Sequence, residues 1–196
     1  MIAKLVSIIG PVGVGKTTLG QKLSAELPAE VIYEDYSGNP FHAPSCKGQD
    51  DLWLPSQIYF INSRARQLCN TSWPTKGLFV SDYGFCQDHI YAEAKLTGAG
   101  LDAYHYIAEQ IAKIVQPPSV IIHLDASVAT LQKRIENRGR DYEATFTSDF
   151  LALLRERHFD ITAPENCELL RIDCDKIDLL KPQVITKLAN RIREAL

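Results

Sequence analysis

The residues with the clearest chemical meaning form one glycine-rich segment near the start of the chain. Residues 10–17 read GPVGVGKT, which matches the phosphate-loop pattern G-x-x-x-x-G-K-[ST]. An apolar run precedes this segment and a helical pattern follows it, so backbone N–H groups and the start of a helix can face a phosphate. The pattern predicts a nucleotide-binding site made by Gly10, Gly13, Val14, Gly15, Lys16, Thr17 and Thr18.

Lys16 and Thr17 have separate roles in such a loop. We expect the Lys16 ammonium to contact the β- and γ-phosphates of ATP and the Thr17 hydroxyl to bind Mg²⁺. Asp82 follows the apolar run 78–81, and an acid at the carboxyl end of a parallel strand can reach the same ion. The alternative for Asp82 is an ordinary turn aspartate.

Two further groups could take part in phosphoryl transfer. Glu34 follows a second apolar run and could accept the proton of an attacking hydroxyl. Arg134 and Arg138 share a helical face, and Gly139 ends that helix just before Arg140, so these arginines could close over a transferring phosphoryl group. A solvated acid and a basic helix end are the plain alternatives.

The elements that must position these residues alternate between strand and helix. Strands are expected at 4–9, 30–33, 78–81, 120–124 and 169–172, and helices at 15–27, 51–69, 102–115, 128–138, 148–159 and 182–195. This alternation predicts an α/β fold, a five-stranded parallel sheet covered by helices on both faces, in one domain of residues 1–196. Residues 38–49 are expected to form a loop over the site.

Composition excludes several other classes of protein. The 196 residues are 45% hydrophobic and 23% charged with a net charge of −3, which argues against a sequence-independent grip on nucleic acid. No apolar run approaches the length of a membrane span, and the start of the chain lacks the pattern of a signal peptide. The five cysteines include no C-x-x-C pair, so free thiols in a cytoplasmic protein are expected.

Several segments, taken in order, resemble the deoxynucleoside kinases, the family that includes deoxycytidine, deoxyguanosine and bacterial deoxyadenosine kinases. The resemblance runs through nearly the whole chain. It is carried by Glu34 with Asn39-Pro40-Phe41, by QIYFINSR at 57–64, by DYGFCQDHIYA at 82–92 and by RIENRGRDYE at 134–143.

This resemblance implies a function and a set of roles. The expected reaction is ATP- and Mg²⁺-dependent phosphorylation of the 5′-hydroxyl of a deoxyribonucleoside, with a purine or cytosine base, by a homodimer of P-loop kinase fold. The resemblance implies that Glu34 is the catalytic base and that Lys16 stabilises charge together with Arg134, Arg138 and Arg140, which lie in a lid at about 134–147. It implies that Gln57, Arg64 and Asp88 recognise the base and that Glu143 contacts the sugar 3′-hydroxyl. The loop of Asp173 and Asp175 is implied to contact adenine.

The chain departs from the family pattern at two positions. Asp82-Tyr83-Gly84 stands where the family has Asp/Glu-Arg-Ser, so Tyr83 could keep a hydroxyl at the substrate but carries no charge. Cys46 stands where the family has a tyrosine. Two alternatives therefore stay open: a nucleoside monophosphate kinase similar to thymidylate kinase, and a non-catalytic nucleotide-binding subunit of the same fold.

Overall fold

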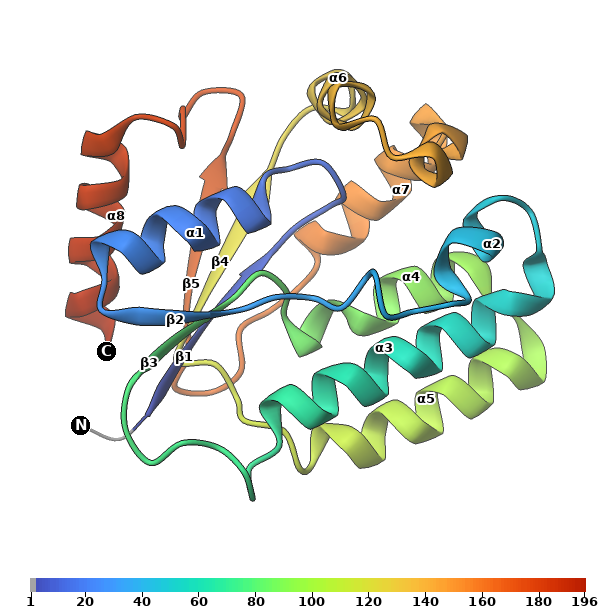
Figure 1. Ribbon diagram of the computed structural model, residues 1–196, viewed down its shortest axis with the longest axis horizontal. Helices are drawn as coiled ribbons and strands as arrows, with labels where there is room; N and C mark the ends of the chain where they lie inside the picture. The colour runs from blue at the N-terminus through green and yellow to red at the C-terminus, as the bar shows by residue number, and fades with distance from the viewer. Residues whose placement is uncertain (1–2) are drawn as a thin grey trace.

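A five-stranded parallel sheet forms the centre of the molecule. The computed structural model describes residues 3–196, and its strands run in the order β2-β3-β1-β4-β5 (Figure 1). Their bounds are β1 (Lys4–Ile9), β2 (Ala29–Ile32), β3 (Leu78–Ser81), β4 (Val120–Asp125) and β5 (Glu168–Asp173). The expected strands and the α/β class are confirmed, with strand ends shifted by at most one residue.

The helices follow the expected alternation and add two elements. Their bounds are α1 (Lys16–Glu26), α2 (His42–Cys46), α3 (Trp53–Leu68), α4 (Asp88–Lys95), α5 (Gly98–Ala112), α6 (Val128–Arg138), α7 (Ser148–Phe159) and α8 (Pro182–Ala195). None of the helices within residues 3–196 is long and apolar enough to cross a membrane.

The two added helices correct the expectation for their segments. Residues 38–49 are not wholly a loop, because α2 forms within them. This helix has five residues, too few to show a periodic pattern, and Pro44 is tolerated because it lies in the first turn. Helix α4 has a clearer signal, since it begins with an acid, Asp88, and buries Ile90 and Ala92.

Alternating side chains of the strands build a separate core on each face of the sheet. Val6 and Ile8 of β1 pack in the cluster that includes side chains of α1 and α8. Leu5 packs with residues of α3, and Ile9 packs with residues of α4 and α7. Figure 1 shows the same division, with α1 beside α8 and with α3, α4 and α5 grouped together.

The order of the strands creates a crevice at one edge of the sheet. The chain passes from β1 to β2 and β3 on one side, then crosses to β4 and β5 on the other, so the direction of winding changes at β1. Ser7 of β1 is in register with Ser81 of β3. The segments that follow these two strands, the phosphate loop and Asp82, therefore leave the sheet side by side.

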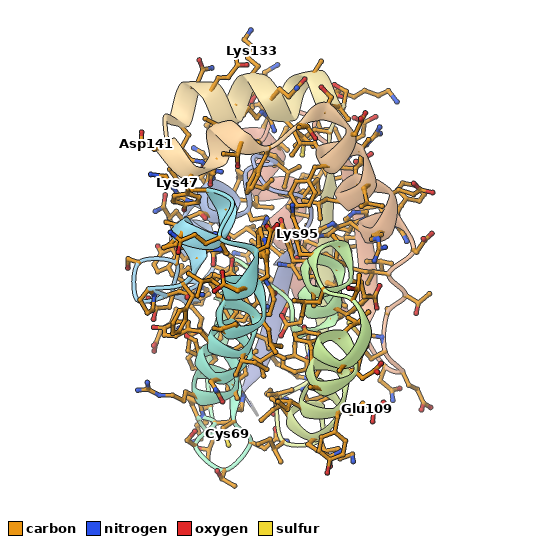
Figure 2. All side chains as sticks on the ribbon, turned by 90° about the vertical axis from the view of Figure 1, so that its right-hand side faces the viewer. Lys47, Cys69, Lys95, Glu109, Lys133 and Asp141 are labelled. Atoms are coloured by element: carbon orange, nitrogen blue, oxygen red, sulfur yellow. The ribbon has the colours of Figure 1, made fainter. Side chains whose placement is uncertain are left out.

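The segment after α6 lies above this edge. The 3₁₀ helix η3 (Asp141–Thr145) follows α6 and packs on α2, and Asp141 is seen near Lys47 (Figure 2). The Thr145 hydroxyl donates a hydrogen bond of 2.9 Å to the backbone oxygen of Cys46. Residues 134–147, here named the arginine segment, are thus held against α2.

Gly84 allows β3 and β1 to end close together. A Cβ atom at Gly84 would lie 2.5 Å from Cγ2 of Ile9 and 3.2 Å from Sγ of Cys86. Ile9 is fully buried, so it has little freedom to move away. The absence of a side chain is therefore a packing requirement at this position.

The variant Gly84→Ala should lower the free energy of unfolding by about 1–3 kcal/mol because the added methyl overpacks the core. Urea denaturation measures the change. Gly100→Ala in α5 is the control, because a Cβ there meets no atom within 4 Å and alanine favours a helix by up to about 1 kcal/mol. Equal stability of the two variants would contradict the packing requirement.

Candidate active site

The phosphate loop begins where β1 passes close to β4. Gly10 has φ +141°, and a Cβ atom there would lie 2.3 Å from the backbone oxygen of Leu124, so only glycine fits. Lys16 folds back over the loop, and its Nζ donates to the oxygens of Gly10 at 2.7 Å and Pro11 at 3.1 Å. The ammonium group therefore lies against the start of the loop that is expected to hold phosphate.

Lys16 is nearly buried although it carries a charge. Its exposed fraction is 9%, and burial lowers its pKa to about 8, an effect that the nearby Asp82 carboxylate opposes. Burial therefore destabilises the charged form of Lys16. Phosphate oxygens would supply the compensating negative charge.

Asp82 joins three parts of the site through one carboxylate. Thr17 donates its hydroxyl to Oδ2 of Asp82 at 2.5 Å, and the backbone N–H of Glu34 donates to Oδ1 at 2.8 Å. Burial raises the pKa of Asp82, while the hydrogen bond from Thr17 and the charge of Lys16 oppose that change. The hydroxyl and carboxylate oxygens are the hard ligands that Mg²⁺ prefers.

A small cavity of about 40 Å³ lies beside the phosphate loop, and we name it the acceptor pocket. Its lining includes Glu34, Gln57 and Arg64, as expected. The Arg64 guanidinium forms ion pairs with both Glu34 and Asp88, and all three side chains are nearly buried. The predicted base-recognition residues are thus brought together with the predicted catalytic base.

Aromatic rings hold Arg64 in this position. The guanidinium carbon lies 5.4 Å from the ring centroid of Phe60 and 5.3 Å from that of Tyr83. Helix α3 presents Gln57, Phe60 and Arg64 on one face, because they are spaced three and four residues apart. Helix α3 therefore supplies one wall of the acceptor pocket.

A larger cavity of about 460 Å³, named here the phosphate pocket, opens over the loop. Residues 12–18 line it together with three arginines of the arginine segment, as expected. Glu143 binds two of them: Nε and a terminal nitrogen of Arg138 donate to Oε2 at 3.0 and 2.5 Å, and Arg140 donates to Oε1 at 3.2 Å. Arg134 donates to the backbone oxygen of Val14 at 2.8 Å.

The two pockets share walls. Lys16, Tyr36 and Glu143 line both of them. Glu143 is only 2% exposed and lies between the arginines and the acceptor pocket. A group bound at the phosphate loop would therefore face a group bound beside Glu34.

Three predicted residues lie elsewhere. The Tyr83 ring is fully buried against α3, and its hydroxyl donates to Oε1 of Gln67 at 2.5 Å, so it lines neither pocket. Asp173 forms an ion pair with Lys176, and Asp175 accepts a hydrogen bond from the backbone of Ser127. The wall of the phosphate pocket in this region is instead made by residues 178–180.

Sequence reasoning missed part of the acceptor pocket. The additional lining residues are Tyr36, His42, Phe60, Gln87 and Tyr91. His42 lies edge-on to Phe60 and to Tyr142, with centroid distances of 5.1 and 5.2 Å. The signal for Phe60 was its place on the face of α3, whereas His42 belongs to the short helix α2 and carried no periodic signal.

Comparison with known proteins identifies the family. The family model "Deoxynucleoside kinase" matches residues 6–196. The chain belongs to the deoxynucleoside kinase family. It is accordingly a phosphotransferase that converts a deoxynucleoside to its monophosphate, and this finding favours the first expectation over both alternatives.

Relatives of this deoxynucleoside kinase carry names for several bases. Deoxyguanosine kinase of Bacillus subtilis is 32% identical over 78% of this chain and 75% of its own, and deoxyadenosine/deoxycytidine kinase of the same organism is 27% identical over 91% and 86%. A structure of deoxyadenosine kinase from M. mycoides with dCMP and dCDP bound shares the fold, with a TM-score of 0.82 and 19% identity over 98% of this chain and 100% of the other.

Replacing Lys16 should separate nucleotide binding from stability. Lys16→Met is expected to abolish ATP binding in calorimetry yet raise the free energy of unfolding by about 1–3 kcal/mol, because the cost of a buried charge is removed. The stability difference from the wild type should narrow as pH rises from about 8 towards 10.5, the window in which only the unfolded lysine keeps its proton. A Lys16→Met variant that is less stable at pH 7 would contradict this interpretation.

Proposed function

We propose that this kinase transfers the γ-phosphoryl group of ATP to the 5′-hydroxyl of a deoxyribonucleoside, with Glu34 as the base. The observation that carries the proposal is the meeting of the two pockets at Lys16, with the phosphate loop on one side and Glu34 on the other. A donor phosphate and an acceptor hydroxyl in these pockets would be held in contact, which is the main requirement of phosphoryl transfer.

Glu34 supplies the proton acceptor for this reaction. As the 5′-oxygen forms a bond to the γ-phosphorus, the bond to the bridging oxygen of ADP breaks and the hydroxyl proton passes to the Glu34 carboxylate. The Arg64 guanidinium is ion-paired with that carboxylate. The backbone of Glu34 is in turn fixed by Asp82.

Positive side chains stabilise the charge that develops on the phosphoryl group. Lys16 belongs to the phosphate loop, and Arg134, Arg138 and Arg140 also line the phosphate pocket. Glu143 of the arginine segment lines both the acceptor pocket and the phosphate pocket, so this segment covers both of them. We therefore propose that the arginine segment acts as a lid that opens for the substrate and closes for the reaction.

Thr17 and Asp82 are proposed to hold Mg²⁺ together with phosphate oxygens and water. Within residues 3–196 no group of three or more His, Cys, Asp or Glu side chains could hold a metal alone, which suits an ion that arrives with ATP. The ion would neutralise charge on the β- and γ-phosphates. Burial raises the pKa of Asp82, so a proton competes with the metal for this carboxylate at a higher pH than at an ordinary aspartate.

The acceptor is proposed to be a purine or cytosine deoxynucleoside. Gln57 presents a donor and an acceptor in one plane, and Arg64 and Asp88 add a donor fork and a carboxylate beside it. The names of the relatives cited above, for guanine, adenine and cytosine nucleosides, support the same range. Their names do not separate these three bases.

A homodimer in the cytoplasm is proposed from the resemblance to the family. Tyr106 of α5 and Ile114 in the turn after it are exposed and offer apolar surface for such an interface. Sedimentation equilibrium measures the state directly, and a monomer at micromolar concentration would contradict the proposal.

Replacement of the proposed base should greatly reduce turnover without weakening the binding of ATP. Glu34→Gln is expected to lower kcat by about 10²–10⁴-fold while the Kd for ATP changes little, because the variant keeps the shape but loses the proton acceptor. Asp35→Asn is the control, since this neighbouring acid bonds Tyr59 outside both pockets. Equal turnover of Glu34→Gln and wild type would exclude Glu34 as the base.

A coupled ADP-release assay identifies the acceptor. The four deoxynucleosides, their ribose counterparts and dTMP are each supplied with ATP and Mg²⁺. Turnover with deoxyguanosine, deoxyadenosine or deoxycytidine is the expected result. Turnover confined to dTMP would contradict the proposal, as would no turnover with any deoxynucleoside.

A further inference from the structure

The peptide group that joins Tyr33 to Glu34 is held at both of its polar ends. Its N–H, which belongs to Glu34, donates to Oδ1 of Asp82 at 2.8 Å. Its carbonyl, which belongs to Tyr33, accepts from Nε2 of Gln67 at 3.0 Å. A peptide group fixed in this way sets the direction in which the Glu34 side chain leaves the backbone.

Gln67 is itself oriented by Tyr83. The Tyr83 hydroxyl donates to Oε1 of Gln67 at 2.5 Å, which leaves the amide nitrogen facing the Tyr33 carbonyl. Asp82 and Tyr83 are neighbours just after β3, and successive side chains there point to opposite faces of the sheet. They therefore act on the peptide group between Tyr33 and Glu34 from different sides. Asp82 acts directly, and Tyr83 acts through Gln67.

The starting point of this chain of hydrogen bonds is buried and well supported. Ser81 donates its hydroxyl to the backbone oxygen of Tyr83 at 2.6 Å, and the Ser81 and Ser7 hydroxyls are 3.0 Å apart. The Tyr83 ring is fully buried in the cluster that contains Leu5 and Leu68. Tyr83 is therefore fixed by the sheet, and α3 provides the link to the segment after β2.

We infer that Tyr83 is a positioning residue for Glu34 and acts through Gln67. The inference rests on the proposed function, in which Glu34 is the base. The ring of Tyr83 adds a second support, because it lies 5.3 Å from the guanidinium carbon of Arg64, which is paired with Glu34. The Tyr83 hydroxyl thus orients the backbone at Glu34, while the Tyr83 ring packs against Arg64, the ion-pair partner of the Glu34 side chain.

The variant Tyr83→Phe tests the hydroxyl alone, because it keeps the ring beside Arg64. We expect kcat to fall about tenfold, since a small misplacement of a catalytic group costs up to about a hundredfold, with the KM for ATP within about twofold of the wild type. Tyr104→Phe is the matched control, because Tyr104 is also fully buried and its hydroxyl has no hydrogen-bond partner within the described part of the chain. This control should leave kcat and KM unchanged.

A second variant shows whether Tyr83 acts through Gln67. Gln67→Leu removes the same hydrogen bonds between Tyr83 and the Tyr33 carbonyl. Gln67 is partly exposed on α3, so this variant keeps the test available if Tyr83→Phe folds poorly. The double variant should lose no more activity than either single variant, because both remove one connected unit. The positioning role would be overturned if the losses of kcat in the single variants multiplied in the double variant. It would also be overturned if kcat were unchanged and only the melting temperature fell.

The outcomes separate this inference from the proposed function. A wild-type enzyme that turns over no deoxynucleoside contradicts the proposed function itself. An active wild type, together with Tyr83→Phe and Gln67→Leu variants of unchanged kcat, overturns only the positioning role.

Discussion

The site depends on the hydrogen bonds of the Asp82 carboxylate. Its two oxygens bind the start of α1 and the segment after β2, so residues 17, 34 and 82 are fixed relative to one another. Burial of an acid is costly, and the two hydrogen bonds and the nearby Lys16 offset that cost. The donor and acceptor sides of the enzyme consequently share one anchor, and neither can shift alone.

Arg64 performs a comparable task inside the acceptor pocket. One buried cation bridges Glu34 and Asp88, which would otherwise place two carboxylates near each other without compensation. The flat guanidinium is also packed beside Phe60 and Tyr83. Lysine would carry the same charge but could not combine two ion pairs with stacking. Arg64 is therefore held from several sides, by two carboxylates and two aromatic rings.

The sequence was sufficient for the sheet, the phosphate loop and most residues of the two pockets. These features depend on local patterns: the spacing of glycines, apolar runs that end in acids, and the periodic face of α3. The place of Tyr83 depends on which face of β3 it belongs to. Alternation along β3 places Phe79 and Tyr83 on the face of α3 and Val80 on the face of α1, but the packing of the Tyr83 ring with Leu5 and Leu68, which keeps it out of the pocket, is set by the tertiary structure.

Other parts could not be read from local pattern. His42 enters the pocket from a helix of five residues, and Gln67 becomes important only because the Tyr33 carbonyl and the Tyr83 hydroxyl lie on either side of it. Such contacts join residues far apart in the chain. They depend on the tertiary arrangement of β2, β3 and α3, which no single window of sequence contains.

The pairing of Glu143 with Arg138 and Arg140 places an internal carboxylate in competition with any anion that binds these arginines. Any phosphate oxygen that takes one of these guanidinium groups must first displace a carboxylate already bound there. Its net gain is the difference between two similar charge-assisted interactions. A lone inorganic phosphate gains little from such an exchange. A triphosphate that is bound at the same time by the phosphate loop keeps enough binding free energy to displace Glu143. The internal carboxylate would therefore favour the binding of polyphosphates over that of simple anions.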